Sequence, residues 1–154
     1  MRCRERLDSY LRDHDVAYAF QKHDGAFTAQ EVAAAEHVPG YMFAKAVMVE
    51  ADGDLAMALV PAPSRIDLDK VARALGVREA HLAPENTFGS RFPDCEVGAM
   101  PAFGNLYGIP VVVDRGLTHN PTIVSQAGSH TETVTVAYAD FERLVRPKEA
   151  DISE

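Results

Sequence analysis

The sequence lacks several features that would assign it to a protein class at once. Its two cysteines, Cys3 and Cys95, lie far apart and form neither a CxxC motif nor a Cys/His ligand spacing. Neither a disulfide framework nor a zinc site is therefore expected, and both cysteines are predicted to be free thiols. No apolar run approaches the roughly 18 residues of a membrane span, and the charged start MRCRERLDSYLRDHD is unlike a signal peptide. We expect a cytoplasmic protein without a membrane partner.

Positive charge is also scarce. Fifteen Lys and Arg residues stand against 23 Asp and Glu residues, which gives a formal net charge of -8. A field of this sign repels phosphate at long range, so broad nonspecific adhesion to nucleic acid is disfavoured. A local basic cleft is still compatible with this composition.

The chain has the length and hydrophobic content of one domain. It has 154 residues, of which 47% are hydrophobic, and it shows no internal repeat, low-complexity tract or Ser/Gly linker. These features predict a single domain over residues 1–154, because two domains of this total length would each have a small core.

Helical signals and strand signals are mixed along the chain. Helices are predicted at 4–14, from Thr28 to about Gly40, at 67–77, from Pro84, and at 140–145. Thr28 and Glu31 have the spacing of a capping box, and Gly76 is expected to close the helix at 67–77. Strands are predicted at 16–21, 41–50, 54–60, 109–114, 122–126 and 132–138, with the Asp52-Gly53 turn joining the second and third as a hairpin. Hairpins without regular βαβ alternation indicate an α+β fold, in which a mixed, largely antiparallel central sheet is flanked by helices.

Lys45 interrupts an apolar row. In the stretch YMFAKAVMV, alternate residues would share one strand face, and Lys45 falls between Phe43 and Val47. The lysine could lie near a strand end or on an edge strand and reach water. Alternatively, its amine projects into a cleft where a ligand replaces the water.

The stretch GAMPAFGNLYG predicts an irregular loop with exposed backbone amides. Gly98 and Gly104 could serve a ligand, or they could simply let the chain turn. Asp114 ends the following strand and either orients a ligand or caps the next turn. His130, in the turn AGSH, either contacts a ligand or is solvated.

Several segments together resemble one family. TAQEVAAAEHVPGYMFAKAVMV, GAMPAFG, VVVDRGL and AGSHTETVTVAYADFERLV are similar, in this order, to the YbaK/prolyl-tRNA editing family, which includes free-standing relatives of the editing domain of bacterial prolyl-tRNA synthetases. The resemblance runs from about His23 to Val145, giving a domain core of about 23–145. It implies the family's fold and hydrolysis of the ester in wrongly charged aminoacyl-tRNA.

The resemblance also implies site residues. Lys45 matches the family's pocket lysine, which deacylation needs, and Gly98 matches the loop glycine whose amide faces the substrate carbonyl. On this basis we expect the Lys45 amine to point into a pocket lined by the 98–104 loop. The implied substrate-binding residues are Pro101, Ala102, Phe103, Gly104, Asp114, Gly128 and His130. No metal and no cofactor are expected.

Two departures from the family pattern leave the substrate open. The family's loop proline corresponds to Ala102, whereas this chain has Pro101, and Ala46 replaces a polar residue of alanyl-tRNA-specific members. One hypothesis is a deacylase acting on the aminoacyl-tRNA acceptor end, with a synthetase as a possible partner. The other is a non-catalytic module that senses an amino acid or nucleotide, or docks on a synthetase. The oligomeric state is not indicated by the sequence.

A cysteine hydrolase is disfavoured. The segment FPDCEVG around Cys95 carries no recognisable nucleophile turn.

Overall fold

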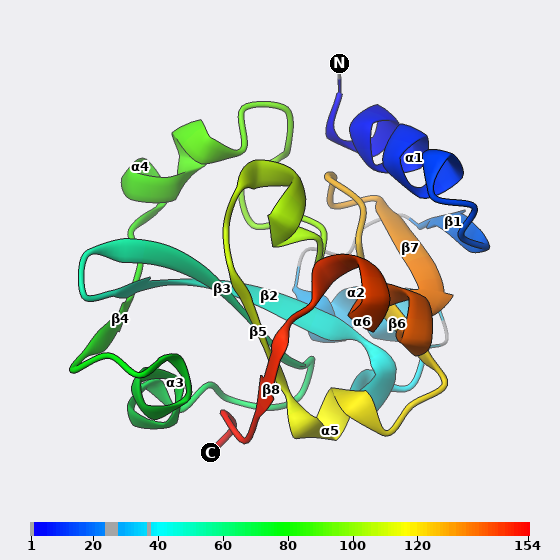
Figure 1. The fold of residues 1–154 in the computed structure, drawn as a ribbon. Helices are drawn as coiled ribbons and strands as arrows, with labels where there is room; N and C mark the ends of the chain where they lie inside the picture. The colour runs from blue at the N-terminus through cyan, green and yellow to red at the C-terminus, as the bar shows by residue number, and fades with distance from the viewer. Residues whose placement is uncertain (1, 24–27, 37) are drawn as a thin grey trace.

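The computed structural model describes residues 2–23, 28–36 and 38–154 (Figure 1). Its helices are α1 (Cys3–Asp13), α2 (Ala29–Ala35), α3 (Leu68–Leu75), α4 (Glu85–Phe88), α5 (Arg115–Thr118) and α6 (Tyr138–Val145), and its short 3-10 turns are Gly40–Met42, Gly89–Arg91 and Gly104–Tyr107. Its strands are β1 (Tyr18–Lys22), β2 (Ala44–Ala51), β3 (Asp54–Pro61), β4 (Ala80–Leu82), β5 (Val111–Asp114), β6 (Thr122–Gln126), β7 (Glu132–Ala137) and β8 (Lys148–Ala150).

The strands form two sheets. A five-stranded sheet has the order β4-β2-β3-β5-β8, in which β2 pairs antiparallel with β3 and β4, and β5 pairs parallel with β3 and β8. A three-stranded antiparallel sheet has the order β1-β7-β6. A parallel bridge between Phe43 and Val124 connects the two sheets. The α+β class and the mixed pairing predicted from the sequence are confirmed, although the strands divide into two sheets.

Local sequence signals account for the main boundaries. Thr28 and Glu31 form both hydrogen bonds of a capping box at the start of α2. Asp52 and Gly53 adopt positive φ angles of 49° and 91° in the turn between β2 and β3. Gly76 ends α3 in the left-handed conformation. All three features match the sequence predictions.

Three clusters of buried residues make up the core. The first joins α1, α6, the loop around Phe103 and one face of the five-stranded sheet. The second joins the opposite face of that sheet to α3 and Ile152. The third packs α2 against Phe43 and Val124, between the sheets. Figure 1 shows α3 beside β4 and α1 on the opposite side of the molecule.

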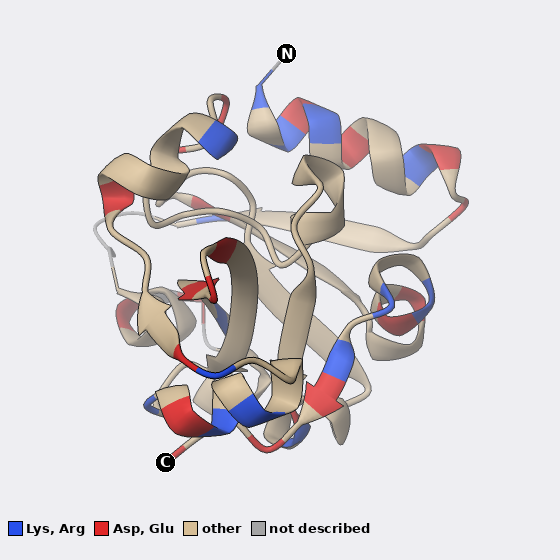
Figure 2. Ribbon diagram, turned by 60° about the vertical axis from the view of Figure 1, so that its left-hand side comes forward, with Lys and Arg blue, Asp and Glu red and all other residues tan. Residues whose placement is uncertain are grey.

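Charged residues of both signs lie along the outer helices, whereas the central strands are mostly uncharged (Figure 2). Lys45 is an exception, because it belongs to β2, a strand with a neighbour on each side. No helix in the described part of the chain is long and apolar enough to cross a membrane.

Candidate functional site

Lys45 projects from one defined face of the five-stranded sheet. Its register partner in β3 is Val60, which is buried in the second core cluster, whereas the preceding Ala44 belongs to the first. Because neighbouring residues of a strand point to opposite faces, Lys45 lies on the face that α3 covers. Its side chain is partly buried, and Nζ donates a 2.8 Å hydrogen bond to the backbone oxygen of Ser64.

Among the described residues, no carboxylate compensates the charge of the Lys45 ammonium. Partial burial lowers the pKa of Lys45 below the ordinary 10.5, and the positive charge of Arg65 lowers it further. Within the described residues, Lys45 forms no ion pair with a carboxylate. A partly dehydrated cation in this setting favours an anionic or strongly polar ligand oxygen.

Four of the predicted substrate-binding residues have buried side chains or, for glycine, a buried backbone. They are Pro101, Ala102, Phe103 and Gly104. The ring of Phe103 packs edge-on against that of Phe141, with 5.7 Å between centroids, and the Ala102 amide donates a 3.3 Å hydrogen bond to Ser125 Oγ. The side chains of this stretch therefore pack into the protein interior.

The loop and Lys45 lie on different sides of the five-stranded sheet. Phe103 belongs to the first core cluster together with Ala44, on the face opposite to Lys45. Three cavities lined by described residues include neither Lys45 nor a residue of the 98–104 loop. The five-stranded sheet therefore separates the Phe103 side chain from the face that carries Lys45.

The structure does bring Gly98, Gly128 and His130 together. Gly98 has a φ of +84°, and a Cβ added there would lie 3.6 Å from His130 Cε1. His130 Nε2 is 2.9 Å from the Val97 oxygen, and the Gly128 amide donates a 2.9 Å hydrogen bond to the Ala99 oxygen. The start of the loop and the turn between β6 and β7 therefore form one unit.

A disulfide joins Cys3 to Cys95, so the prediction of two free thiols is wrong. The two Cα atoms are 5.1 Å apart although 92 residues separate them in sequence. The disulfide connects the start of α1 to the segment that leads into the Gly98 loop. A Cβ on Gly128 would lie 2.6 Å from Cys3 Cβ, so this close approach requires glycine.

A cavity of about 550 Å³ lies beside this disulfide. Its charged lining residues are Arg2, Arg4, Lys22, Glu5, Asp94, Glu96 and Glu132. Arg4 is already paired with Glu132, with 2.5 Å between Nε and Oε2. The two signs nearly cancel in this lining, so its charge selects neither an anion nor a cation.

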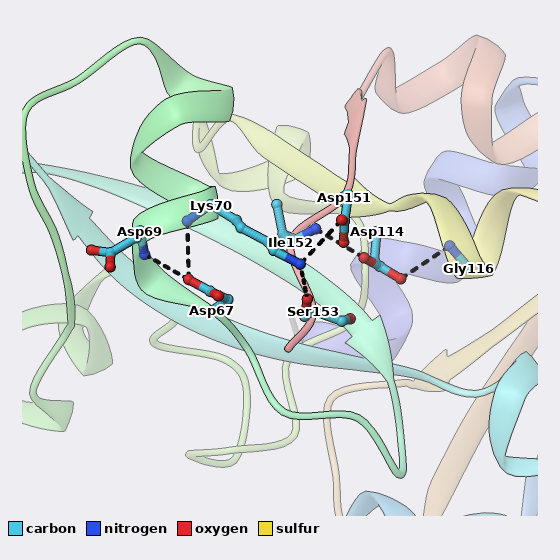
Figure 3. A network of polar contacts seen from close by, with 8 residues as sticks. All are labelled: Asp67, Asp69, Lys70, Asp114, Gly116, Asp151, Ile152 and Ser153. Atoms are coloured by element: carbon cyan, nitrogen blue, oxygen red, sulfur yellow. Dashed lines mark hydrogen bonds and ion pairs between the residues drawn. The ribbon is translucent and has the colours of Figure 1, made fainter.

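Asp114 has a structural role. Its carboxylate accepts hydrogen bonds of 3.0 Å from the amides of Gly116 and Ile152, and the side chain is buried (Figure 3). It thereby caps α5 and holds the C-terminal segment against β5. Of the two interpretations that the sequence left open, the cap is the one observed.

A buried polar cluster was not predicted from the sequence. His23 Nδ1 hydrogen-bonds Glu36, which also accepts a hydrogen bond from the Thr133 hydroxyl. These residues join the end of β1 to α2 and β7, and all three are buried. No spacing in the sequence signals this contact, because it depends on how the elements pack. Within the described residues, no three His, Cys, Asp or Glu side chains gather as metal ligands.

Comparison with solved structures places this architecture among known folds. A hypothetical protein superposes with a TM-score of 0.86 at 18% identity, over 97% of this chain and 99% of its own. A candidate trans-editing enzyme for prolyl tRNA synthetase superposes with a TM-score of 0.81 at 20% identity, over 99% and 97%. A candidate signal transduction protein from Marinobacter aquaeolei VT8 superposes with a TM-score of 0.72 at 18% identity, over 97% of this chain but 30% of its own.

The sequence also matches a family model. The match covers residues 23–144, from the buried His23 through β2 and the Gly98 loop to α6. It thus includes Lys45 and every other predicted site residue. The chain belongs to the aminoacyl-tRNA editing domain family.

Proposed function

We propose that this chain is a deacylase that acts in trans on mischarged aminoacyl-tRNA. The observation that carries the proposal is Lys45, a partly buried ammonium without a carboxylate partner among the described residues, on a strand inside the matched editing domain. The proposed partners are the aminoacyl-tRNA acceptor end and an aminoacyl-tRNA synthetase. Membership of the editing family supports both partners.

The proposed reaction is hydrolysis of the ester between the amino acid and the terminal ribose. A water oxygen attacks the carbonyl carbon, the bond to the ribose oxygen breaks, and that oxygen takes up a proton as the free amino acid leaves. An aminoacyl ester is already activated, so positioning and polarisation of the carbonyl contribute more than a strong nucleophile. A cation and backbone amides can supply both the positioning and the polarisation.

We assign anchoring of the acceptor end to Lys45. Its ammonium would hold a phosphate or ribose oxygen, exchanging part of its hydration for a charged or polar partner. The Gly98 amide is proposed to polarise the carbonyl, because Gly98 is exposed, has a positive φ and carries no side chain of its own. Lys45 carries the proposal and Gly98 has the secondary role, because Phe103 of the same loop lies on the sheet face opposite to Lys45.

A deacylation screen tests the function. Transfer RNAs charged with Ala, Ser, Thr and Pro are incubated with the protein, and loss of the ester is followed over time. At least one of them should be deacylated faster than in buffer. Silence across the full set of charged tRNAs would contradict the proposal and favour the non-catalytic binding module.

The variant Lys45→Ala tests the residue. Loss of one well-placed electrostatic contact in the transition state should lower turnover by ~100-fold or more. Folding should be little affected, because the change removes a partly buried charge without an ion-pair partner. Lys148→Ala is the matched control, since Lys148 is exposed in β8. If Lys45→Ala is folded and deacylates at the parent rate, the lysine has no part in the reaction.

A further inference from the structure

A second cationic residue lies beside Lys45. Arg65 directly follows Ser64, whose backbone oxygen accepts the 2.8 Å hydrogen bond from Lys45 Nζ. Among the described residues, Arg65 is the charged group whose Coulomb repulsion lowers the pKa of Lys45. The two positive charges are therefore close enough to repel each other, on a protein whose formal net charge is -8.

The guanidinium of Arg65 has no ion-pair partner among the residues that the structure describes. Its side chain is exposed, and within the described part of the chain it takes part in no ion pair. By contrast, the amine of Lys70, a few residues further on, already has protein partners. It donates hydrogen bonds of 2.7 Å to the Ser153 backbone oxygen and 3.1 Å to the Asp151 carboxylate. Arg65 and Lys45 thus share an unneutralised positive charge, whereas the neighbouring lysine does not.

The backbone that carries Arg65 is fixed by the C-terminal segment. The Glu154 amide donates a 2.9 Å hydrogen bond to the Arg65 oxygen, and the Asp67 amide donates one of 2.8 Å to the Ile152 oxygen. Ile66 and Ser153 form an antiparallel bridge. Figure 3 shows how Lys70 and Asp114 hold this C-terminal segment from two sides. The backbone of Arg65 is therefore held in place, while its side chain is exposed to the solvent.

We propose that Arg65 and Lys45 together bind one phosphate group in the acceptor end of the tRNA. A guanidinium presents a planar fork of donors and an ammonium presents a compact charge, and both are common ligands of phosphate oxygens. A phosphate between them removes their mutual repulsion and uses donors that are unpaired within the described residues. This inference rests on the proposed function and assigns to Arg65 the role of positioning the substrate.

Binding of uncharged tRNA tests the inference without any turnover. The dissociation constant is measured by fluorescence anisotropy over a series of salt concentrations for the parent and for Arg65→Gln. Loss of one phosphate contact should weaken binding about tenfold at low salt, and should reduce the slope of log K against log salt by ~0.7, the value for one phosphate of a single strand. Arg73→Gln is the control, because Arg73 is an exposed arginine of α3 and its change removes the same charge.

A double-mutant cycle tests whether the two residues share one phosphate. If they do, the combined change Lys45→Met with Arg65→Gln should weaken binding by clearly less than the product of the two single effects. Additive effects would refute a shared phosphate, and an Arg65→Gln effect no larger than that of Arg73→Gln would refute the role of Arg65. No binding of tRNA by the parent would overturn the inference as well. If Arg65→Gln weakens binding but no charged tRNA is deacylated, the phosphate site is supported and only the proposed deacylase activity fails.

Discussion

Reduction of the Cys3–Cys95 disulfide should lower the stability of the fold substantially. The bond closes a loop across a sequence separation of 92 residues. The chain-entropy relation gives about 4.6 kcal/mol for a loop of this length at 25 °C. Measured effects are commonly smaller, because the unfolded chain keeps residual structure, so we expect a loss of about 2–4 kcal/mol. For a chain of this size, that corresponds to a fall in Tm of roughly 5–15 °C.

Urea unfolding with and without a phosphine reductant measures this loss directly. The oxidised protein should unfold at higher urea than the reduced protein, and the double variant Cys3→Ser with Cys95→Ser should unfold at lower urea in both conditions. The double variant is also the control, because it cannot respond to the reductant. Equal midpoints for the oxidised and reduced parent protein, with the disulfide verified by mass spectrometry, would refute the reasoning.

Two further predictions concern Gly128 and Lys45. Gly128→Ala should lower the free energy of unfolding by more than ~2 kcal/mol, because the backbone has a φ of +99° and the new Cβ would lie 2.6 Å from Cys3 Cβ. Gly53→Ala, with a φ of +91° and no atom within 4 Å, isolates the backbone contribution and should cost clearly less. The pKa of Lys45, followed by NMR of its side chain, should lie below 10.5 in the free protein and rise when phosphate binds. Above this lowered pKa and up to 10.5, the unfolded chain holds the proton that the folded chain has lost, so Lys45 should make stability increase with pH in that window. A normal lysine titration would contradict the burial and charge that surround Lys45.

Signals that act over a few residues predicted much of the fold. The capping box at Thr28, the turn at Asp52 and Gly53, and the left-handed end of α3 at Gly76 each depend on residues close in sequence. Strands β4 and β8 were missed. Each has three residues, which is too short for an alternating pattern to be recognised, so pairing with a neighbouring strand defines them.

Local sequence signals did not predict contacts between segments that are distant in sequence. The disulfide joins residues whose sequence spacing matches no motif. The buried cluster of His23, Glu36 and Thr133 combines three elements that meet only in the folded chain. The glycine-rich pattern correctly indicated an irregular loop. It could not show that Phe103 would turn into the core, because exposure of an irregular segment depends on what packs against it.

The position of Lys45 follows from the same distinction between local and distant effects. The alternating pattern correctly predicted a strand through Lys45, although this strand begins at Ala44 and not at Tyr41. An edge position would explain the lysine as protection against sheet pairing; on the side away from β3, β2 pairs with β4 only over Val49–Ala51. Near its start, β2 instead lies next to the three-stranded sheet, through the bridge between Phe43 and Val124. A charge held at such a junction costs desolvation, and Arg65 adds repulsion to that cost. Neither cost is offset by a carboxylate within the described residues, so the interaction that compensates them is expected to come from a bound anion, for which the acceptor end of tRNA is the candidate that the editing family supports.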